Sequence, residues 1–252
     1  MDLEVEHARD FRDENAMGGF GDPGSYALLK TTADRVVAAL LLAASAPLIL
    51  VLMAMVRMSS RGPAIYSQVR LGLDGRPYAI FKLRSMREDC EQATGAVWAR
   101  PGDPRVTPLG RFLRKTHLDE LPQLWNVLRG DMSLVGPRPE RPVFVDKLEK
   151  MIPGYRGRMR VRPGITGLAQ VQLPPDEDYD GVSRKVAYDL YYVRSASLAL
   201  DVQIVVGTAL KIAGLPFEII RRGTGLPTRD EVYGLAPPDG SLACAEPATV
   251  AG

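Results

Sequence analysis

The apolar positions of this chain are unevenly distributed, and the longest run of them lies near the N-terminal end. Residues 36–56 form a stretch of 21 residues without a charged side chain, bounded by Arg35 and Arg57. As a straight helix this stretch would be about 32 Å long, enough to cross the hydrocarbon core of a bilayer. The pattern predicts a membrane helix. A cleaved signal peptide fits less well, because a long acidic segment precedes the run and the run continues past its small-residue site.

A proline interrupts this apolar run near its middle. Proline removes one helical hydrogen bond and crowds the preceding turn, so we expect a kink near Ser45, Ala46 and Pro47. Each half alone, at about 14 to 17 Å, is too short to span a membrane. A sharply bent helix could enter and leave by the same face, whereas a mildly kinked one could still span. Positive residues flank both ends, so charge does not decide the topology.

Polar segments without apolar periodicity lie at both ends of the chain. Residues 1–29 are rich in glycine and charge, and residues 215–252 end in small residues. Both are predicted to be tails. Between them we expect a membrane segment over residues 30–60 and one folded domain over residues 61–214.

Within that domain the pattern predicts one hairpin and several helices. Asp74-Gly75 is a tight-turn signal between two stretches rich in β-branched and aromatic residues, so residues 65–82 are predicted to form a hairpin. Lys82 and Arg84 should share one face of its second strand, either as a solvated edge or as anion ligands. Helices are predicted from Thr107-Pro108, over residues 142–151, and twice within residues 186–214, with loops at 87–105 and 174–178. The last helix is nearly apolar all round, which suits a core or a membrane interface.

Four arginines alternate with small or apolar residues after residue 155. A period of two places Arg156, Arg158, Arg160 and Arg162 on one face of an extended segment. They could form a solvated basic edge or a site for phosphate groups. The second interpretation is favoured for Arg160 and Arg162.

The densest group of polar signals surrounds the acidic pair Asp119-Glu120. Thr116 lies three residues before Asp119, the spacing of a capping box, and Gly130 supplies a stop after apolar residues at helical spacing, Leu121, Leu124, Trp125 and Leu128. The pair should therefore lie in the first turn of a helix, where free amides favour an ionised carboxylate. The simpler alternative is that Asp119 only caps the helix, worth about 1 kcal/mol.

Cations and a rigid turn near the pair favour a chemical role. Arg111, Arg114 and Lys115 precede it, and Gly136-Pro137-Arg138-Pro139 follows the predicted helix. Prolines stiffen the backbone around Arg138, and guanidinium matches the geometry of phosphate. An ionised carboxylate beside a fixed phosphate binder indicates phosphoryl chemistry.

Composition excludes several other classes of protein. Of 252 residues 46% are hydrophobic, and the net charge is only +2, so no general affinity for nucleic acid is expected. Two cysteines, Cys90 and Cys244, and two histidines, His7 and His117, provide no disulfide framework, zinc spacing or Ser-His-Asp triad. Neither a G-x-G-x-x-G nor a P-loop motif is present, which argues against a dehydrogenase or kinase.

The stretch RKTHLDELPQLWNVLRGDMSLVGPRPE, residues 114–140, resembles the signature of the bacterial sugar transferases, or monotopic phosphoglycosyl transferases. The resemblance includes FKLRSM at 81–86 and RPGITGLAQV at 162–171, and it extends over roughly residues 30–214. It implies an α+β, mostly helical, single catalytic domain with a short hairpin, anchored by a re-entrant helix to the cytoplasmic face of the bacterial inner membrane. Without the four N-terminal spanning helices of longer relatives, the chain resembles the short form.

The resemblance also assigns roles to individual residues. It implies that Asp119 attacks the β-phosphate of a UDP-sugar and expels UMP, that Glu120 helps to hold Mg²⁺, and that the sugar-phosphate passes to polyprenyl phosphate, which primes polysaccharide synthesis. Substrate contacts would come from the residues of the three motifs: Lys82, Arg84, Arg114, Pro137, Arg138, Pro139, Arg160 and Arg162. The sequence departs from the family at the Ser-Pro break, here Ala46-Pro47 with Ser45 displaced, and at His117, where a small hydroxyl residue is more usual.

Two other functions are consistent with the sequence. A membrane-tethered paralogue could keep the fold as a scaffold without catalysis. The intact set of Asp119, Glu120, Arg138 and Lys82 argues against this alternative. An ordinary glycosyltransferase would release UDP instead of UMP. The sugar and the polysaccharide pathway are not readable from the sequence, and a homo-oligomer is compatible with it.

Overall fold

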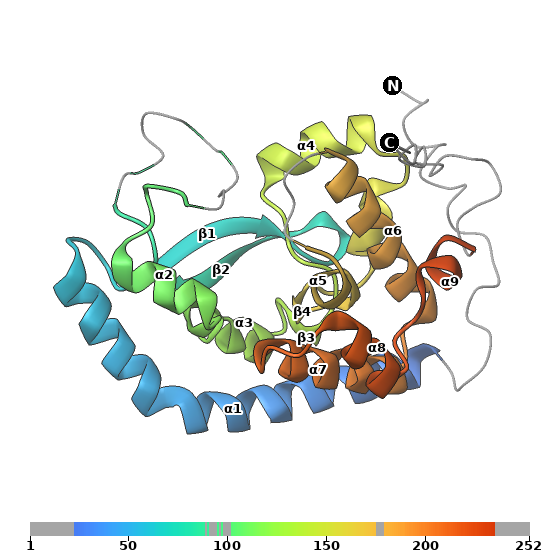
Figure 1. Ribbon diagram of the computed structural model, residues 1–252, viewed down its shortest axis with the longest axis horizontal. Coiled ribbons are helices and arrows are strands. Elements are labelled where there is room, and N and C mark those ends of the chain that lie inside the picture. The colour runs from blue at the N-terminus through green and yellow to red at the C-terminus, as the bar shows by residue number, and fades with distance from the viewer. Residues whose placement is uncertain are drawn as a thin grey trace, which may run out of the picture.

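A computed structural model describes residues 23–88, 90, 95, 97, 102–174 and 179–234. The predictions for His7, Cys244 and residues 1–22, 175–178 and 235–252 lie outside these residues. Within them the fold is mostly helical with one hairpin, as the sequence predicted, and one further pair of strands. A long helix runs along one side of the molecule, and the other elements gather on one side of it (Figure 1).

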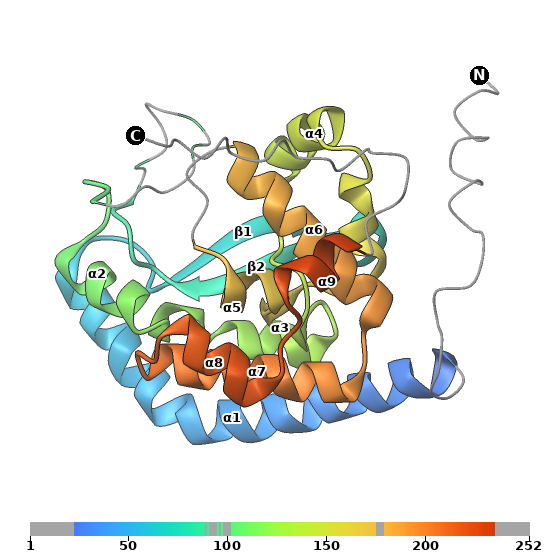
Figure 2. The same cartoon turned by 45° about the vertical axis from the view of Figure 1, so that its right-hand side comes forward.

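The long helix, α1 (Pro23–Ser59), is continuous through Pro47. Its ribbon changes direction near the middle in both Figure 1 and Figure 2. Pro47 has no N–H to donate to the carbonyl of Ala43, so one helical hydrogen bond is missing there. One turn earlier, the Ser45 hydroxyl donates to the carbonyl of Leu41 at 2.7 Å. Both features favour a bend. The helix begins at Pro23, so residues 23–29 belong to it and the predicted boundary at residue 30 does not coincide with its start.

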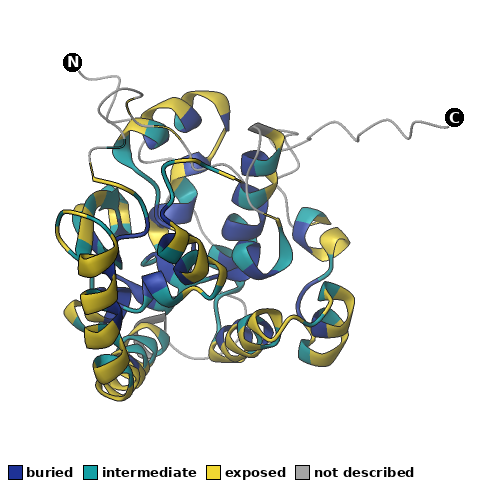
Figure 3. Cartoon of the chain, turned by 60° about the vertical axis from the view of Figure 1, so that its left-hand side comes forward, coloured by how far each residue is buried: buried dark blue, intermediate teal, exposed yellow. Residues whose placement is uncertain are grey.

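Most of α1 is exposed although it is apolar. It is long and apolar enough to cross a membrane, and only 17% of its most apolar window is buried, which distinguishes it from the core helix of a soluble domain. One face packs on the rest of the protein through buried Ala38, Leu52 and Val56. Figure 3 shows buried positions gathered between the helices and exposed positions on their outer faces.

The predicted hairpin is confirmed. Strand β1 (Ile65–Leu71) pairs antiparallel with β2 (Pro77–Leu83), and Tyr66 lies opposite Lys82. The turn places Asp74 at φ 54° and Gly75 at φ 72°, the left-handed conformation that Asp-Gly turns adopt most readily.

The remaining helices are α2 (Pro108–Lys115), α3 (Gln123–Arg129), α4 (Pro142–Met151), α5 (Leu168–Gln172), α6 (Tyr179–Ser195), α7 (Leu198–Ile212), α8 (Phe217–Thr224) and α9 (Arg229–Gly234). The predictions of a helix opening at Thr107-Pro108, of α4 and of two helices near residues 186–214 are confirmed. The pattern did not reveal β3 (Ser133–Val135) and β4 (Gly164–Thr166), which pair in parallel.

The predicted C-terminal tail is wrong for the residues up to Gly234. Helices α8 and α9 cover the main hydrophobic core, where Ile220 and Val232 are 1% and 3% exposed. Each is short, eight and six residues, so the apolar positions are too few to show a helical period along the sequence.

The prediction that Thr116 opens a helix is also wrong. Thr116 closes α2, and its hydroxyl donates back to the carbonyl of Phe112 at 2.9 Å. His117 then adopts a left-handed conformation with φ 56°, and a 3-10 turn, η3 (Leu118–Glu120), precedes α3. Helix α3 begins only after Pro122 and ends, as predicted, at Gly130. The acidic pair therefore lies in a 3-10 turn between two helices.

The four alternating arginines do not share a face. Residues 155–160 form a 3-10 helix, η4 (Tyr155–Arg160), which follows Gly154 at φ 71°, so the segment is not extended. Arg158 is buried at 8% exposure, whereas Arg156 and Arg160 are exposed. In a strand, residues two apart point to the same side, because each step rotates the side chain by about 180°. In a 3-10 helix each step rotates it by far less, so residues two apart point in different directions.

Candidate active site

The acidic pair is buried at the junction of α2, η3 and the hairpin. Asp119 and Glu120 are 6% and 9% exposed. The backbone N–H of Glu120 donates to the carbonyl of His117 at 3.1 Å, so the left-handed residue sets the direction of the turn. Two adjacent buried carboxylates are costly unless cations or ligands compensate them.

Asn126 fixes the position of this turn against the hairpin. It is fully buried in α3, its Oδ1 accepts from the N–H of Phe81 at 3.1 Å, and its Nδ2 donates to the carbonyl of Ala79 at 2.7 Å. The amide thus binds the backbone of β2 on both sides of one residue. This docking brings Lys82 opposite Glu120. This role of Asn126 was not predicted from the sequence, although an amide among apolar helical positions is a signal of such a role.

Glu120 is held by two cations. The Nζ of Lys82 donates to its Oε1 at 2.7 Å, and Nη2 of Arg138 donates to the same oxygen at 2.8 Å. Burial raises the pKa of the Glu120 carboxyl, but Arg138 and Lys82 lower it by more, so the pKa lies well below its ordinary value. Glu120 is therefore ionised, and its negative charge is already balanced.

Asp119 has no such partner. Among the described residues no hydrogen bond or ion pair holds its carboxylate, although it is as buried as Glu120. Burial and the charge of Glu120 raise the pKa of Asp119, and the charges of Lys82, Arg114 and Arg138 oppose this rise without cancelling it. Because its oxygens are not held by hydrogen bonds or ion pairs, the Asp119 carboxylate is available to attack an electrophile, whereas the paired carboxylate of Glu120 is not.

Arg138 projects from a turn fixed by backbone contacts. A Cβ on Gly136 would lie 2.3 Å from the carbonyl oxygen of Arg162, so only glycine fits there. The carbonyl of Pro137 accepts from the N–H of Gly164 at 2.9 Å, which ties the turn to β4. The carbonyl of Pro139 accepts from Arg70 at 3.2 Å. The Arg138 side chain itself is 47% exposed, so it can meet a substrate.

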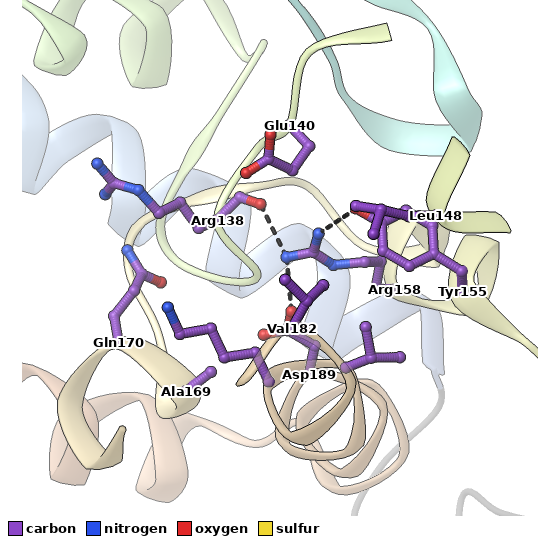
Figure 4. Close-up of a pocket in the computed structure, with 11 residues that line it drawn as sticks. Arg138, Glu140, Leu148, Tyr155, Arg158, Ala169, Gln170, Val182 and Asp189 are labelled. Atoms are coloured by element: carbon purple, nitrogen blue, oxygen red, sulfur yellow. Dashed lines mark hydrogen bonds and ion pairs between the residues drawn. The ribbon is translucent and has the colours of Figure 1, made fainter. Parts of the chain in front are cut away.

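Arg158 also supports the turn and was not predicted to do so. Its Nη2 donates to the carbonyl of Arg138 at 2.9 Å and pairs with Asp189 at 2.6 Å, and its Nη1 donates to the Tyr155 hydroxyl at 2.9 Å (Figure 4). Because the buried Arg158 binds the backbone carbonyl of Arg138, it is a positioning residue for the turn. No sequence pattern distinguished it from its exposed neighbours.

The structure places other predicted site residues elsewhere. Arg84 lies just past the end of β2 and donates to the carbonyl of Ser60 at 2.7 Å, next to the C-terminal end of α1. Arg160 and Arg162 line a second cavity of about 370 Å³ between α1 and the domain, where Arg162 donates to the carbonyl of Gly130 at 3.0 Å. Arg114 stays near Asp119 and donates to the Ser85 hydroxyl at 2.8 Å. The core of the predicted site, Asp119, Glu120, Lys82, Arg114 and Arg138 with Pro137 and Pro139, is brought together.

The residues present fit a magnesium ion only as a partial site. Among the described residues no group of three His, Cys, Asp or Glu side chains could hold a metal. Both cations on Glu120 use Oε1, which leaves Oε2 of Glu120 and the carboxylate of Asp119 for other contacts. Mg²⁺ commonly takes one or two carboxylates together with substrate phosphate oxygens, and this donor set meets that requirement.

The fold and site define a class of protein: a catalytic domain docked on a long apolar helix, with a buried carboxylate pair and a fixed guanidinium suited to a phosphate-bearing substrate. The chain belongs to the bacterial sugar transferase family, whose family model matches residues 25–214.

Relatives of assigned activity agree with this membership. The chain is 43% identical over 206 residues to the UDP-N-acetylgalactosamine-undecaprenyl-phosphate N-acetylgalactosaminephosphotransferase of Aeromonas hydrophila, covering 82% of this chain and 48% of that one. It is 46% identical over 185 residues to the UDP-glucose:undecaprenyl-phosphate glucose-1-phosphate transferase of Caulobacter vibrioides, covering 72% and 68%. It is 50% identical over 151 residues to a putative undecaprenyl-phosphate N-acetylgalactosaminyl 1-phosphate transferase of Bacillus subtilis, covering 58% and 84%. The match thus spans about half of the first relative and most of the last.

Proposed function

We propose that this protein transfers a sugar-1-phosphate from a UDP-sugar to undecaprenyl phosphate or a similar polyprenyl phosphate, the first step of polysaccharide or glycoconjugate synthesis. Relatives that share 43 to 50% of the matched residues carry names of this activity. The observation that carries the mechanism is the contrast within the acidic pair: Glu120 is neutralised by Lys82 and Arg138, while Asp119 is buried and unpaired within the described part of the chain.

In the first half-reaction a carboxylate oxygen of Asp119 attacks the β-phosphorus of the donor. The bond from that phosphorus to the oxygen bridging the two phosphates breaks, UMP leaves, and an aspartyl phosphate carrying the sugar remains. In the second half-reaction an oxygen of the polyprenyl phosphate attacks the same phosphorus and releases Asp119. The product is a polyprenyl diphosphate sugar. Neither half-reaction needs a proton from the protein.

The cations around the pair make this attack feasible. Because Arg138 is half exposed and its backbone is fixed at three carbonyls, its side chain can bind the diphosphate while the backbone stays in place. Lys82 keeps Glu120 neutralised when Arg138 turns to the substrate. Magnesium, held by Glu120 and the diphosphate, would supply further charge neutralisation when bound.

The anchor suits a lipid-linked acceptor. We infer that α1 enters the membrane as a re-entrant hairpin bent at Ser45, Ala46 and Pro47, with both ends on the cytoplasmic face of the inner membrane. The bent course of the ribbon, the missing hydrogen bond at Pro47 and the exposed apolar surface of α1 support this topology. A catalytic site beside such a helix meets the acceptor phosphate at the interface.

The nucleotide product tests this function against its alternatives. Purified protein in detergent, given a UDP-sugar, Mg²⁺ and a polyprenyl phosphate, should release UMP, measured by chromatography of the reaction. An ordinary glycosyltransferase would release UDP instead. A catalytically inactive scaffold would release neither nucleotide from any donor, and either result would contradict the proposal.

A further inference from the structure

Ser85 lies two residues beyond the end of β2 at Leu83, and it is 7% exposed. We infer that Ser85 is a positioning residue: it holds Arg114 so that the two terminal nitrogens of the guanidinium bind the phosphate group that Asp119 takes up. This inference rests on the proposed function and adds to it, because Arg114 then touches the substrate and Ser85 acts through Arg114.

The backbone of Ser85 fixes the start of α2. The N–H of Thr107, the N-cap residue of α2, donates to the carbonyl of Ser85 at 3.0 Å. A Cβ on Gly110 would lie 1.9 Å from the same carbonyl oxygen, so only glycine permits this close approach. Both contacts use backbone atoms of Ser85, and they do not depend on its hydroxyl.

The hydroxyl of Ser85 fixes a side chain in the last turn of α2. The Nε of Arg114 donates to the Oγ of Ser85 at 2.8 Å. Gly110 and Arg114 are four residues apart, so both lie on the face of α2 that is turned toward Ser85. The start of α2 and the Arg114 side chain are therefore held by the same residue.

The contact with Ser85 uses only one of the three nitrogens of the guanidinium. Among the described residues Nη1 and Nη2 of Arg114 have no hydrogen-bond or ion-pair partner, and neither nitrogen is fully buried. These two nitrogens form a planar fork of donors, whose geometry matches two oxygens of a phosphate. The fork is available to an anionic ligand.

A neighbouring contact places Arg114 at the acidic pair. Lys82, three residues before Ser85, binds Glu120 at 2.7 Å, so the end of β2 contacts both α2 and the turn η3. Arg114 lies five residues before Asp119, and its positive charge opposes the rise in the pKa of the Asp119 carboxyl. The fork of Arg114 thus lies near the carboxylate that attacks the phosphate.

The cations of the site fall into two groups. Lys82 and Arg138 bind Glu120, whereas Arg114 has no carboxylate partner in the described part of the chain. A phosphate that approaches Asp119 brings negative oxygens toward a negative carboxylate. A guanidinium nearby compensates for this repulsion, and because Ser85 already holds Arg114 in place, little reorganisation accompanies the reaction.

Ser85→Ala tests the positioning, because it removes the hydroxyl and keeps the backbone contacts of α2. The single-turnover rate of UMP release from a UDP-sugar, without lipid acceptor, should fall by about 10- to 100-fold. Transfer of the sugar-phosphate to polyprenyl phosphate should slow by a similar factor, since the same phosphorus reacts in both steps. Slowing of only one half-reaction would assign Arg114 to the leaving UMP or to the acceptor and would overturn the inference.

Ser60→Ala is the matched control. The Oγ of Ser60 accepts from Nη2 of Arg84 at 3.0 Å, so this variant also removes a serine hydroxyl that binds a guanidinium, one residue away from Ser85 in the motif. It does not alter the contact of Arg114. Both half-reactions should keep wild-type rates.

A double-mutant cycle separates positioning from a purely structural effect. If Ser85 acts through Arg114, Ser85→Ala should have no further effect in an Arg114→Gln background, and the double variant should be as slow as Arg114→Gln alone. Losses that multiply in the double variant would make Ser85 a structural residue and would contradict the inference.

Arg114→Lys provides a second test if Ser85→Ala lowers thermal stability. Lysine keeps the positive charge but has neither the fork nor the Nε that Ser85 binds, so the first half-reaction should slow by a similar factor. Unchanged rates in Ser85→Ala or in Arg114→Lys would overturn the inference. Absence of UMP release by the wild-type protein from any UDP-sugar would overturn the proposed function itself, which is a distinguishable result.

Discussion

Two aspartates in this protein are equally buried and have opposite surroundings. Asp119 is 6% exposed and Asp201, in α7, is 7% exposed. Asp201 accepts from the Tyr192 hydroxyl at 2.6 Å, from Lys30 at 2.8 Å and from the Tyr26 hydroxyl at 3.2 Å. It joins α1, α6 and α7 into one network. Asp119 has no equivalent contact within the described residues.

The difference shows how the protein distributes its cations. At Asp201 a cation and two hydroxyl groups satisfy the charge, and the result is a fixed junction between α1 and the domain. At the active site Lys82 and Arg138 both contact Glu120, and Arg114 donates to Ser85, which leaves Asp119 unpaired within the described residues. A satisfied buried carboxylate stabilises the fold, whereas an unsatisfied one is a cost retained for chemistry.

The largest difference between replacing Asp119 and replacing Asp201 should be in the rate of turnover. Asp119→Asn should lower the rate of UMP release by at least about 1000-fold, because the nucleophile is lost. Asp201→Asn is the isosteric control and should keep a near wild-type rate per folded molecule. Steady-state UMP release on matched amounts of folded protein measures both. An equal loss of UMP release in the two variants would contradict the assignment of a catalytic role to Asp119 and a structural role to Asp201.

Stability should change in the reverse order. Asp201→Asn should lower the free energy of unfolding by about 2 kcal/mol, since three hydrogen bonds to a charged acceptor weaken. Because the pKa of Asp119 is raised in the folded state, its ionised form at neutral pH opposes folding, so Asp119→Asn should raise the melting temperature at pH 7. Thermal unfolding in one detergent compares the variants. A lower melting temperature for Asp119→Asn would contradict the unpaired state of this carboxylate.

The pH dependence of the first half-reaction should show the same contrast more weakly. Asp119 must be ionised to attack, so the rate should fall as pH decreases through its pKa, and that midpoint should lie above about 4, the ordinary value for aspartate. Glu120, with a lowered pKa, stays ionised throughout this range. Single-turnover UMP release without lipid avoids titration of the acceptor phosphate, whose second pKa is near 6. A midpoint at or below 4 would be inconsistent with the environment described for Asp119.

Local patterns predicted much of this arrangement. The apolar run, the Asp-Gly turn and the proline-flanked Arg138 each depend on neighbouring residues, and the structure has a helix, a hairpin and a rigid turn there. The resemblance of its motif predicted Lys82 as a residue of the site, but not its ion pair with Glu120. The helix, the hairpin and the rigid turn need few contacts distant in the sequence.

The missed features depend on such contacts. Arg84 and Arg138 are both arginines within recognisable motifs, but only tertiary packing directs one to the end of α1 and the other to Glu120. Helix α2 continues to Lys115 because it packs on the hairpin through fully buried Leu113, which overrides the capping signal at Thr116. Trp125 has helical spacing but is 51% exposed, since buried Asn126 turns the helix toward β2.

The central claim is that Asp119 forms a covalent phosphosugar intermediate while Glu120 does not. Intact-protein mass spectrometry tests it directly, after incubation of wild type, Asp119→Asn and Asp201→Asn with a panel of UDP-sugars and Mg²⁺ in the absence of lipid acceptor. We predict an added mass equal to one sugar-phosphate on wild type and on Asp201→Asn, and none on Asp119→Asn. An adduct on Asp119→Asn would show that another residue is the nucleophile and would contradict the account.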